Sequence, residues 1–195
     1  SGDVYKRQDF NSLSSNNTIK KIEKACIEVG FFQIIGHGIK IKKINNICKI
    51  GNKFFNSSEK NKKKLAPKKW NSKNKNLYRG YFPNSVNGKE GLDLGDLKIT
   101  SKNSKKYKSP YIEYLNLNKS FSKISIKSLS KYFDEIFSLS EILFKSIIKL
   151  YKKDGNISSH AFSRIKTLST LRFNYYPNQI KPVEVSKQDG IALGC

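Results

Sequence analysis

The sequence predicts an α+β fold, and three observations lead to this class. Apolar side chains recur every three or four residues over residues 126–151, which is typical of one long amphipathic helix. Two short runs, residues 31–35 and 171–176, are rich in aromatic and aliphatic side chains and predict strands. Neither an internal repeat nor a linker divides the 195 residues, and 37% of them are hydrophobic, so one globular domain is expected.

The first eight residues are expected to lie outside the fold. Residues 3–8 read D-V-Y-K-R-Q, which matches what one reading frame of a transposon end used in sequencing-library preparation encodes. Segments of that origin are set apart before the fold is considered. We therefore expect residues 1–8 to be an adaptor artefact and the chain to be a translated gene fragment, open at both ends.

The next part of the chain predicts a helix, a buried strand and a second helix. Ile19, Ile22, Cys26 and Val29 give residues 18–29 a helical apolar stripe, and a glycine follows. Residues 31–35 predict a buried strand, and the sequence G-H-G at 36–38 predicts a tight turn before a helix that ends at Phe54 and Phe55. Asn56, with Glu59 three residues on, can start a third helix through a capping box.

The middle and the end of the chain alternate between loops, strands and the long helix. Residues 67–76 form a polar loop that contains Trp70, the only tryptophan, and residues 77–82 and 93–99 predict short strands. Residues 87–88 predict a turn between them, and residues 102–110 a loop. After the long helix, residues 161–168 are a helical turn or a loop. A strand then closes on Pro177, and another begins at residues 191–193.

The net charge of +23 comes almost entirely from lysine. A basic surface gains affinity for nucleic acid by releasing counterions from the phosphates. The lysines are scattered over predicted loops and helix faces, for example within residues 60–64, and they occur with abundant Asn and Ile, whose codons are also A/T-rich. No basic motif with interleaved aromatic residues accompanies them. We therefore expect a solvated surface, and a nucleic-acid-binding module stays the alternative.

By spacing alone, the chain carries no complete active site. Its two histidines lie far apart, and we expect His37 to be a hydrogen-bonded turn residue and His160 a surface residue. The cysteines Cys26, Cys48 and Cys195 are odd in number and show no CxxC spacing, which argues against a disulfide framework or a cysteine-built zinc site. No apolar run approaches the roughly 18 residues of a membrane span, and no signal peptide is visible, so we expect a cytoplasmic protein with no membrane partner.

A resemblance to a known family indicates a fold and a function, which composition alone does not. Residues 25–39, A-C-I-E-V-G-F-F-Q-I-I-G-H-G-I, resemble the N-terminal signature of the isopenicillin N synthase-like family of non-haem iron(II), 2-oxoglutarate-dependent dioxygenases. In that family a helix is followed by G-F-F at the start of a strand and then by H-G-I. Further matches follow in the family's order over residues 9–195: Phe54-Phe55 with Ser58-Glu59-Lys60, Arg79-Gly80-Tyr81, residues 92–98, the long helix, and L-R-F-N-Y-Y-P at 171–177.

The resemblance implies an architecture and indicates which part of that architecture this chain covers. N-terminal helices would pack on a partial double-stranded β-helix, or jelly roll, with one long covering helix. Residues 9–115 would be the dioxygenase N-terminal region, and residues 116–195 the long helix plus the first strands of the truncated oxygenase core. In the family, a His-x-Asp pair that binds iron follows the N-Y-Y-P strand, and a later histidine and Arg-x-Ser complete the site. The chain is therefore expected to end before its metal ligands, to be inactive in isolation and to have neither iron(II) nor 2-oxoglutarate bound.

The resemblance also implies cofactors and site residues. Two histidines and a carboxylate hold iron(II) and leave positions for 2-oxoglutarate and dioxygen, which oxidise a small-molecule substrate. By motif matching, Asn174 and Tyr176 are expected to bind 2-oxoglutarate, with packing as the alternative for Tyr176. Tyr175 alternates to the other strand face and is expected to pack. Arg79 and Arg172 can offer a guanidinium to a substrate carboxylate, or else form structural salt bridges.

One alternative within the family stays open. The protein can share the fold and act as an oxidase without 2-oxoglutarate, as isopenicillin N synthase itself does. The Arg-x-Ser motif would decide between the two, because the distal carboxylate of 2-oxoglutarate needs a cation. The substrate and the outcome of the oxidation do not follow from the sequence.

Overall fold

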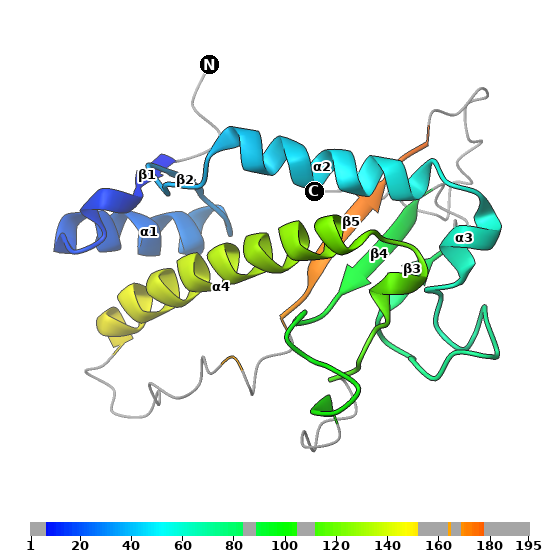
Figure 1. The fold of residues 1–195 in the computed structure, drawn as a ribbon. Helices are drawn as coiled ribbons and strands as arrows, with labels where there is room; N and C mark the ends of the chain where they lie inside the picture. The colour runs from blue at the N-terminus through cyan, green and yellow to red at the C-terminus, as the bar shows by residue number, and fades with distance from the viewer. Residues whose placement is uncertain (1–6, 84–88, 105–111, 152–163, 165–168, 178–195) are drawn as a thin grey trace, which may run out of the picture. The chain divides into compact units, whose positions relative to one another are not determined.

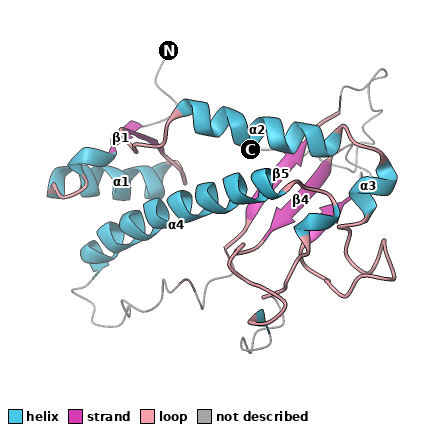
Figure 2. Cartoon of the chain, viewed as in Figure 1, coloured by secondary structure: helices cyan, strands magenta, loops and turns pink. Residues whose placement is uncertain are grey.

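The computed structural model describes residues 7–83, 89–104, 112–151, 164 and 169–177. Their elements follow in the order β1 (Arg7–Asp9), η1 (Phe10–Ser12), α1 (Asn16–Glu28), β2 (Gln33–Ile35), α2 (Ile41–Phe55), α3 (Glu59–Lys63), β3 (Gly80–Phe82), β4 (Glu90–Leu94), η3 (Leu117–Lys119), α4 (Lys123–Tyr151) and β5 (Leu171–Tyr175) (Figures 1 and 2). The chain divides into two compact units, residues 1–44 with 132–167 and residues 45–131 with 168–195. The described elements confirm the α+β class.

Helix α1 of the first unit confirms the helix predicted over residues 18–29. Its buried side chains include Ile19, Ile22 and Ala25, which follow one another at three-residue spacing on one face. Cys26 and Val29, predicted on the same stripe, are exposed. The buried stripe passes through Ala25 instead of its neighbour Cys26, since a helix turns by about 100° per residue.

Strands β1 and β2 form a two-stranded parallel sheet. Arg7 and Gln8, expected outside the fold, pair with Gln33 and Ile34, and Gln8 is buried. The expectation therefore does not hold for these two residues, because their backbone is part of a sheet.

The prediction of a buried strand over residues 31–35 is wrong in extent and in burial. The strand begins at Gln33, and Phe31 and Ile35 are each 48% exposed. Parallel strands are fully buried only where other elements cover both faces of their sheet. Within the described residues, β2 has only the three-residue strand β1 as its partner.

The tight turn at residues 36–38 is confirmed. Gly36 and Gly38 have φ angles of +70° and +75°, a backbone region that favours glycine. A Cβ on Gly36 would lie 2.6 Å from the Oδ1 atom of Asp9, so this turn also needs a residue without a side chain. His37 accepts a hydrogen bond from the amide of Ile39 at 3.1 Å, which confirms its prediction as a hydrogen-bonded turn residue.

Helix α4 confirms the long helix predicted over residues 126–151 and begins three residues earlier. In the first unit, Phe133 and Phe137 are buried on this helix. The guanidinium of Arg164 lies 5.4 Å and 5.3 Å from the centres of these two rings and pairs with Asp134 at 2.6 Å. Aromatic faces attract a cation, so Arg164 covers the apolar stripe at this point.

The second unit is built on the antiparallel sheet β3–β4–β5 (Figure 1). Strand β3 is shorter than the predicted 77–82, because the amides of residues 77–79 donate to the carboxylate of Glu113 at 2.6–3.0 Å. Strand β4 spans residues 90–94 and not 93–99, because beyond Leu94 the chain turns, with Asp96 accepting a bond from the amide of Lys98.

Two glycines allow neighbouring segments to lie close to this sheet. Gly51 of α2 lies against β5, where a Cβ would come within 2.7 Å of the ring of Phe173. Gly80 has a φ of +118°, and a Cβ there would come within 1.9 Å of the carbonyl oxygen of Leu65. Both glycines therefore permit a backbone approach that any larger residue would prevent.

Helix α3 begins two residues later than Asn56 would place it. Ser58 is the N-cap, and its hydroxyl accepts a bond from the amide of Asn61 at 3.3 Å. The capping box predicted from Asn56 and Glu59 is therefore wrong, since the side-chain amide of Asn56 instead donates to the carbonyl of Asn52. Ser is as good an N-cap as Asn, so the local sequence offered both.

Lys62 departs from the expected solvated surface. It is buried, and its ammonium donates to Glu90 at 2.7 Å. The hydroxyl of Tyr81 donates to the same carboxylate oxygen at 2.7 Å. Burial, followed by the hydrogen bond to Glu90, raises the pKa of Tyr81. The three side chains satisfy one another beneath α3, which is how a buried lysine is tolerated.

Candidate functional site

Strand β5 presents two kinds of side chain to its two sides. Tyr175 stacks on Phe55 of α2, with ring centres 4.9 Å apart and planes inclined by 5°, so its predicted packing role is confirmed. Phe173 lies against the same helix. Because side chains alternate along a strand, Arg172 and Asn174 project from the opposite face, where both are exposed.

A pocket of about 260 Å³ opens on the face that carries Arg172 and Asn174. Cross-strand pairing places Gly91 opposite Asn174 and Asp93 opposite Arg172, so these four positions share one side of the sheet. We call this space the strand-face pocket. Its lining consists of Trp70, Phe82, Pro83, Lys89, Gly91, Asp93, Arg172 and Asn174.

An ion pair between two strands forms one wall of the strand-face pocket. The guanidinium of Arg172 donates to the carboxylate of Asp93 from Nε at 2.7 Å and from Nη2 at 2.5 Å. The Asp93 side chain is 4% exposed and that of Arg172 is 58% exposed. Hydrogen bonding to Asp93 raises the pKa of Arg172, so its positive charge is held firmly. The salt-bridge alternative for Arg172 is thus realised, and the residue still faces the pocket.

Arg79 lies near the same carboxylate but does not line the strand-face pocket. Its side chain is half-buried, and its Nε would lie 3.2 Å from a Cβ on Gly95. Burial lowers the pKa of Arg79, and the charges of Asp93 and Glu113 oppose that shift. The structure therefore brings the two predicted arginines to one buried carboxylate and gives only Arg172 access to the pocket.

The two residues expected to bind 2-oxoglutarate occupy different surroundings. Asn174 lines the strand-face pocket. Tyr176 is 50% exposed and is not part of that lining. His160, the predicted turn at 87–88 and the strand at 191–193 lie outside the described residues.

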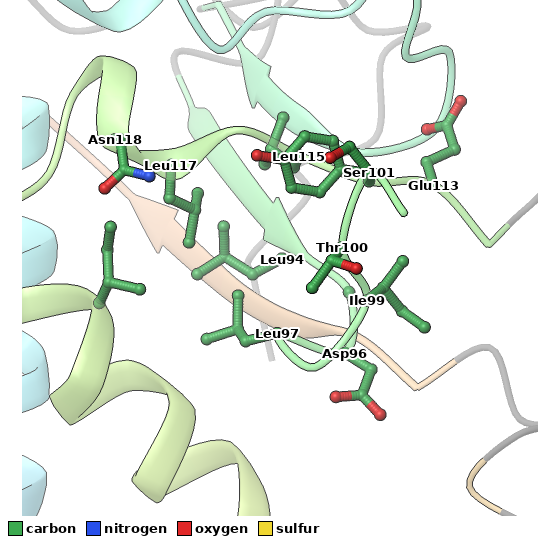
Figure 3. Close-up of a pocket in the computed structure, with 13 residues that line it drawn as sticks. Leu94, Asp96, Leu97, Ile99, Thr100, Ser101, Glu113, Leu115, Leu117 and Asn118 are labelled. Carbon is green, nitrogen blue, oxygen red and sulfur yellow. The ribbon is translucent and has the colours of Figure 1, made fainter. Parts of the chain in front are cut away.

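A second cavity of about 240 Å³ lies at the end of β4, on the side of the sheet opposite Asp93. Leu94, Leu97 and Leu117 point toward a shared apolar space, and Glu113 lies at the far end of the lining (Figure 3). None of the residues predicted for the site lines this cavity. Its acidic residues Asp96 and Glu113 already accept bonds from backbone amides.

The described side chains differ in how well they fit the two cofactors. Among these residues, no group of three or more His, Cys, Asp and Glu side chains is placed to hold a metal ion, so they do not fit iron(II). For 2-oxoglutarate the donor set does fit, because Asn174 offers an amide N–H₂ next to the cations Arg172 and Lys89. Cationic and amide donors are what a dicarboxylate requires.

Three pocket residues do not follow from sequence reasoning. Asp93 lies between two leucines, and in a strand this alternation places its carboxylate on the face opposite the two leucine side chains. That alternation is the sequence signal that could have identified Asp93. Trp70 and Phe82 meet edge to face, with ring centres 5.6 Å apart. Trp70 comes from a loop, so no strand pattern indicates that it reaches the sheet.

Comparisons with known proteins identify dioxygenases as relatives of this chain. The family model for the N-terminal region of non-haem dioxygenases, described as "non-haem dioxygenase in morphine synthesis N-terminal", matches residues 4–123. Protein SRG1 of Arabidopsis thaliana is 24% identical over 179 residues, covering 90% of this chain and 46% of that protein. The chain therefore spans about half the length of the relatives it matches.

Solved structures of dioxygenases have a fold similar to that of this chain. The dioxygenase for auxin oxidation in rice superposes with a TM-score of 0.62 at 14% identity, over 88% of this chain and 51% of that chain. The structure of JOX2 in complex with 2OG, Fe and JA superposes with a TM-score of 0.59 at 19% identity, over 90% and 48%. The chain belongs to the isopenicillin N synthase-like family of non-haem iron(II), 2-oxoglutarate dioxygenases, in its N-terminal region. None of the helices in the described part of the chain combines the length and apolarity that crossing a membrane requires.

Proposed function

We propose that the whole protein is an iron(II)- and 2-oxoglutarate-dependent oxidoreductase that oxidises a small molecule with dioxygen. Within it, residues 9–115 form the dioxygenase N-terminal region. Residues 116–195 contribute the long helix and the first strands of a jelly-roll core. The iron ligands lie outside this chain, which is inactive alone. Membership of the family supports the reaction class.

The strand-face pocket is the observation that carries this proposal. It brings together Asn174 and Arg172, both on the strand that bears the family's N-Y-Y-P sequence, and Lys89, which precedes β4. Asn174 donates to an oxygen of 2-oxoglutarate, and Tyr176 is a second contact at the end of the same strand. Arg172 provides positive charge toward the substrate in this pocket, and Arg79, which does not line it, adds positive charge near Asp93. When bound, iron and 2-oxoglutarate supply the oxidising chemistry, and these side chains bind and orient.

Oxygen uptake by the whole protein tests the proposal. We expect uptake that depends on both iron(II) and 2-oxoglutarate. Asn174→Ala removes one hydrogen bond to a charged ligand and should raise the KM for 2-oxoglutarate about 10-fold. Asn46→Ala, on the exposed side of α2, is the matched control and should leave the KM unchanged. Uptake that proceeds without 2-oxoglutarate would instead favour an oxidase of the isopenicillin N synthase type, and no iron-dependent uptake would remove the enzyme class.

A further inference from the structure

The part of the chain that runs from α3 toward β3 concentrates positive charge (Figure 1). Eight of the 16 residues from 60 to 75 are lysines, and no Asp or Glu occurs from residue 60 to residue 89. A/T-rich codons explain abundant lysine, but the Glu and Asp codons GAA and GAT are A/T-rich as well. Base composition alone therefore does not account for the missing acidic residues. We call residues 60–76 the lysine segment.

Most lysines of this segment have no carboxylate partner. Lys62 pairs with Glu90 at 2.7 Å beneath α3, and Lys63 pairs with Glu59 at 2.9 Å. The others are exposed and form no ion pair with any residue that the structure describes: Lys60, Lys64, Lys68, Lys69, Lys73 and Lys75. Because like charges repel one another, such a surface gains free energy when an anionic partner neutralises it.

Hydrogen bonds hold the backbone of the lysine segment in one conformation. The amide of Lys68 donates to the carbonyl of Asn76 at 2.8 Å, which closes the loop between them. Asn74 is 6% exposed, and its side-chain amide donates to the carbonyls of Lys64 and Ala66 at 3.0 Å and 2.7 Å. A partner therefore meets lysines on an ordered backbone, and binding does not have to order that backbone first.

Exposed apolar side chains adjoin these lysines. Leu77 and Tyr78, which directly follow the segment, are 54% and 43% exposed, and Trp70 within it is 38% exposed. The amides of Leu77 and Tyr78 donate to the carboxylate of Glu113 at 2.6 Å and 2.9 Å, so this turn is fixed as well. Tryptophan and tyrosine favour the headgroup level of a bilayer, and leucine gains free energy when its apolar surface leaves water.

These observations favour a membrane surface over a nucleic acid as the anionic partner. Near an anionic bilayer, lysines act as point charges and need no particular geometry. Nucleic-acid recognition relies strongly on arginine, whose planar guanidinium pairs with phosphate in a fork, and the lysine segment contains none. An exposed leucine beside basic side chains adds to membrane binding but finds no apolar partner on a phosphate backbone.

We propose that the lysine segment, together with Leu77 and Tyr78, docks the protein on the surface of an anionic lipid bilayer. The ammonium groups lie among acidic headgroups, and the two apolar side chains enter the boundary between headgroups and acyl chains. This inference goes beyond the proposed function and does not depend on it. It replaces the expectation of no membrane partner, which rested on the lack of an apolar span and of a signal peptide.

Sedimentation of the whole protein with lipid vesicles tests the proposal. The probes are vesicles of phosphatidylcholine alone and vesicles of equal parts phosphatidylserine and phosphatidylcholine, both at physiological ionic strength. We expect the protein to sediment with the mixed vesicles and to stay in solution with the neutral ones. Each lysine near an anionic surface contributes about fivefold in affinity, so the triple variant K68Q/K73Q/K75Q should bind the mixed vesicles about 100-fold more weakly.

The matched control removes the same amount of charge from other elements. The triple variant K49Q/K53Q/K131Q replaces exposed lysines of α2 and α4 and should keep most of the affinity. Unfolding midpoints of both triple variants should equal that of the parent protein, because all six side chains are exposed. Equal losses of vesicle affinity in the two variants would show that net charge alone causes binding, and would overturn the proposal.

Leu77→Ser separates a lipid partner from a nucleic acid. It should weaken binding to the mixed vesicles about fivefold and leave binding to single-stranded oligothymidylate unchanged. Ile124→Ser, at an 80% exposed position of α4, is its control and should change neither. Three further results overturn the inference: no sedimentation with the mixed vesicles, an unchanged vesicle affinity of Leu77→Ser, or tighter binding to the oligonucleotide than to the vesicles. The last result would assign the lysine segment to nucleic acid.

Discussion

Asp93 of β4 and Arg172 of β5 stand directly opposite each other and join through two hydrogen bonds of 2.7 Å and 2.5 Å. The pair links the sheet to the pocket, since the buried carboxylate belongs to the core of the strand and the exposed guanidinium to the ligand side. The ion pair thus crosses from β4 to β5 at one position of their register and sets the direction of the charge that the pocket presents.

Replacing the carboxylate of this pair tests how much the pair stabilises the fold. Asp93→Asn keeps the shape but removes the negative charge that pairs with Arg172, and we expect a loss of about 1–3 kcal/mol in the free energy of unfolding. Denaturant titration measures it. The control is Glu141→Gln, which breaks an exposed pair with Lys145 and should cost less than about 0.5 kcal/mol. Equal effects of the two substitutions would contradict a buried role for Asp93.

The buried hydroxyl of Tyr81 predicts a dependence of stability on alkaline pH. Its pKa is raised in the fold, so its contribution is complete below the unfolded value of about 10 and is lost as the pH rises toward the folded value. Tyr81→Phe should cost about 1–2 kcal/mol at neutral pH, because Glu90 loses a donor. The difference in unfolding free energy between the two proteins should be flat up to about pH 9 and shrink above it. A difference that grows with pH has the wrong sign and rejects the explanation.

The contact of Gly51 with Phe173 predicts a packing defect. Gly51→Ala should destabilise the protein by about 1–2 kcal/mol, because overpacking outweighs the better helix propensity of alanine. The thermal midpoint reports the change. Phe173→Leu in the same chain should recover part of the loss by removing the ring that the new methyl group meets. The exposed neighbour Asn52→Ala should be neutral, and a stabilising Gly51→Ala would show that α2 does not lie this close to β5.

The sequence predicts those parts of the fold that local periodicity determines. The 3.6-residue pattern finds α1, α2 and α4, and the two-residue pattern separates Tyr175, which packs, from Asn174, which faces the pocket. The same reasoning misplaces β3 and β4, because their limits depend on distant partners. Glu113 takes the amides before β3 from 34 to 36 residues away.

The site depends on the same kind of distant contact. Arg172 meets Asp93 across 79 residues, and Lys62 meets Glu90 across 28. The alternation around Asp93 can indicate the face of the strand on which its carboxylate lies, but no local pattern identifies the distant partner of Asp93 or of Lys62. Lys62 is therefore expected in solvent. The family resemblance identifies the strand that carries Arg172 and Asn174. The contact between the rings of Trp70 and Phe82 becomes known only from the structure.

The most direct test of the central claim is the NMR signal of the Asn174 side-chain amide while 2-oxoglutarate is added to the whole protein. Asn174→Ala assigns the signal, and Asn46, exposed on α2, serves as the internal reference. If the strand-face pocket is the ligand-binding face of the oxygenase, the Asn174 amide shifts saturably and the Asn46 amide does not. An Asn174 signal that stays in place while the chain is folded would contradict the account.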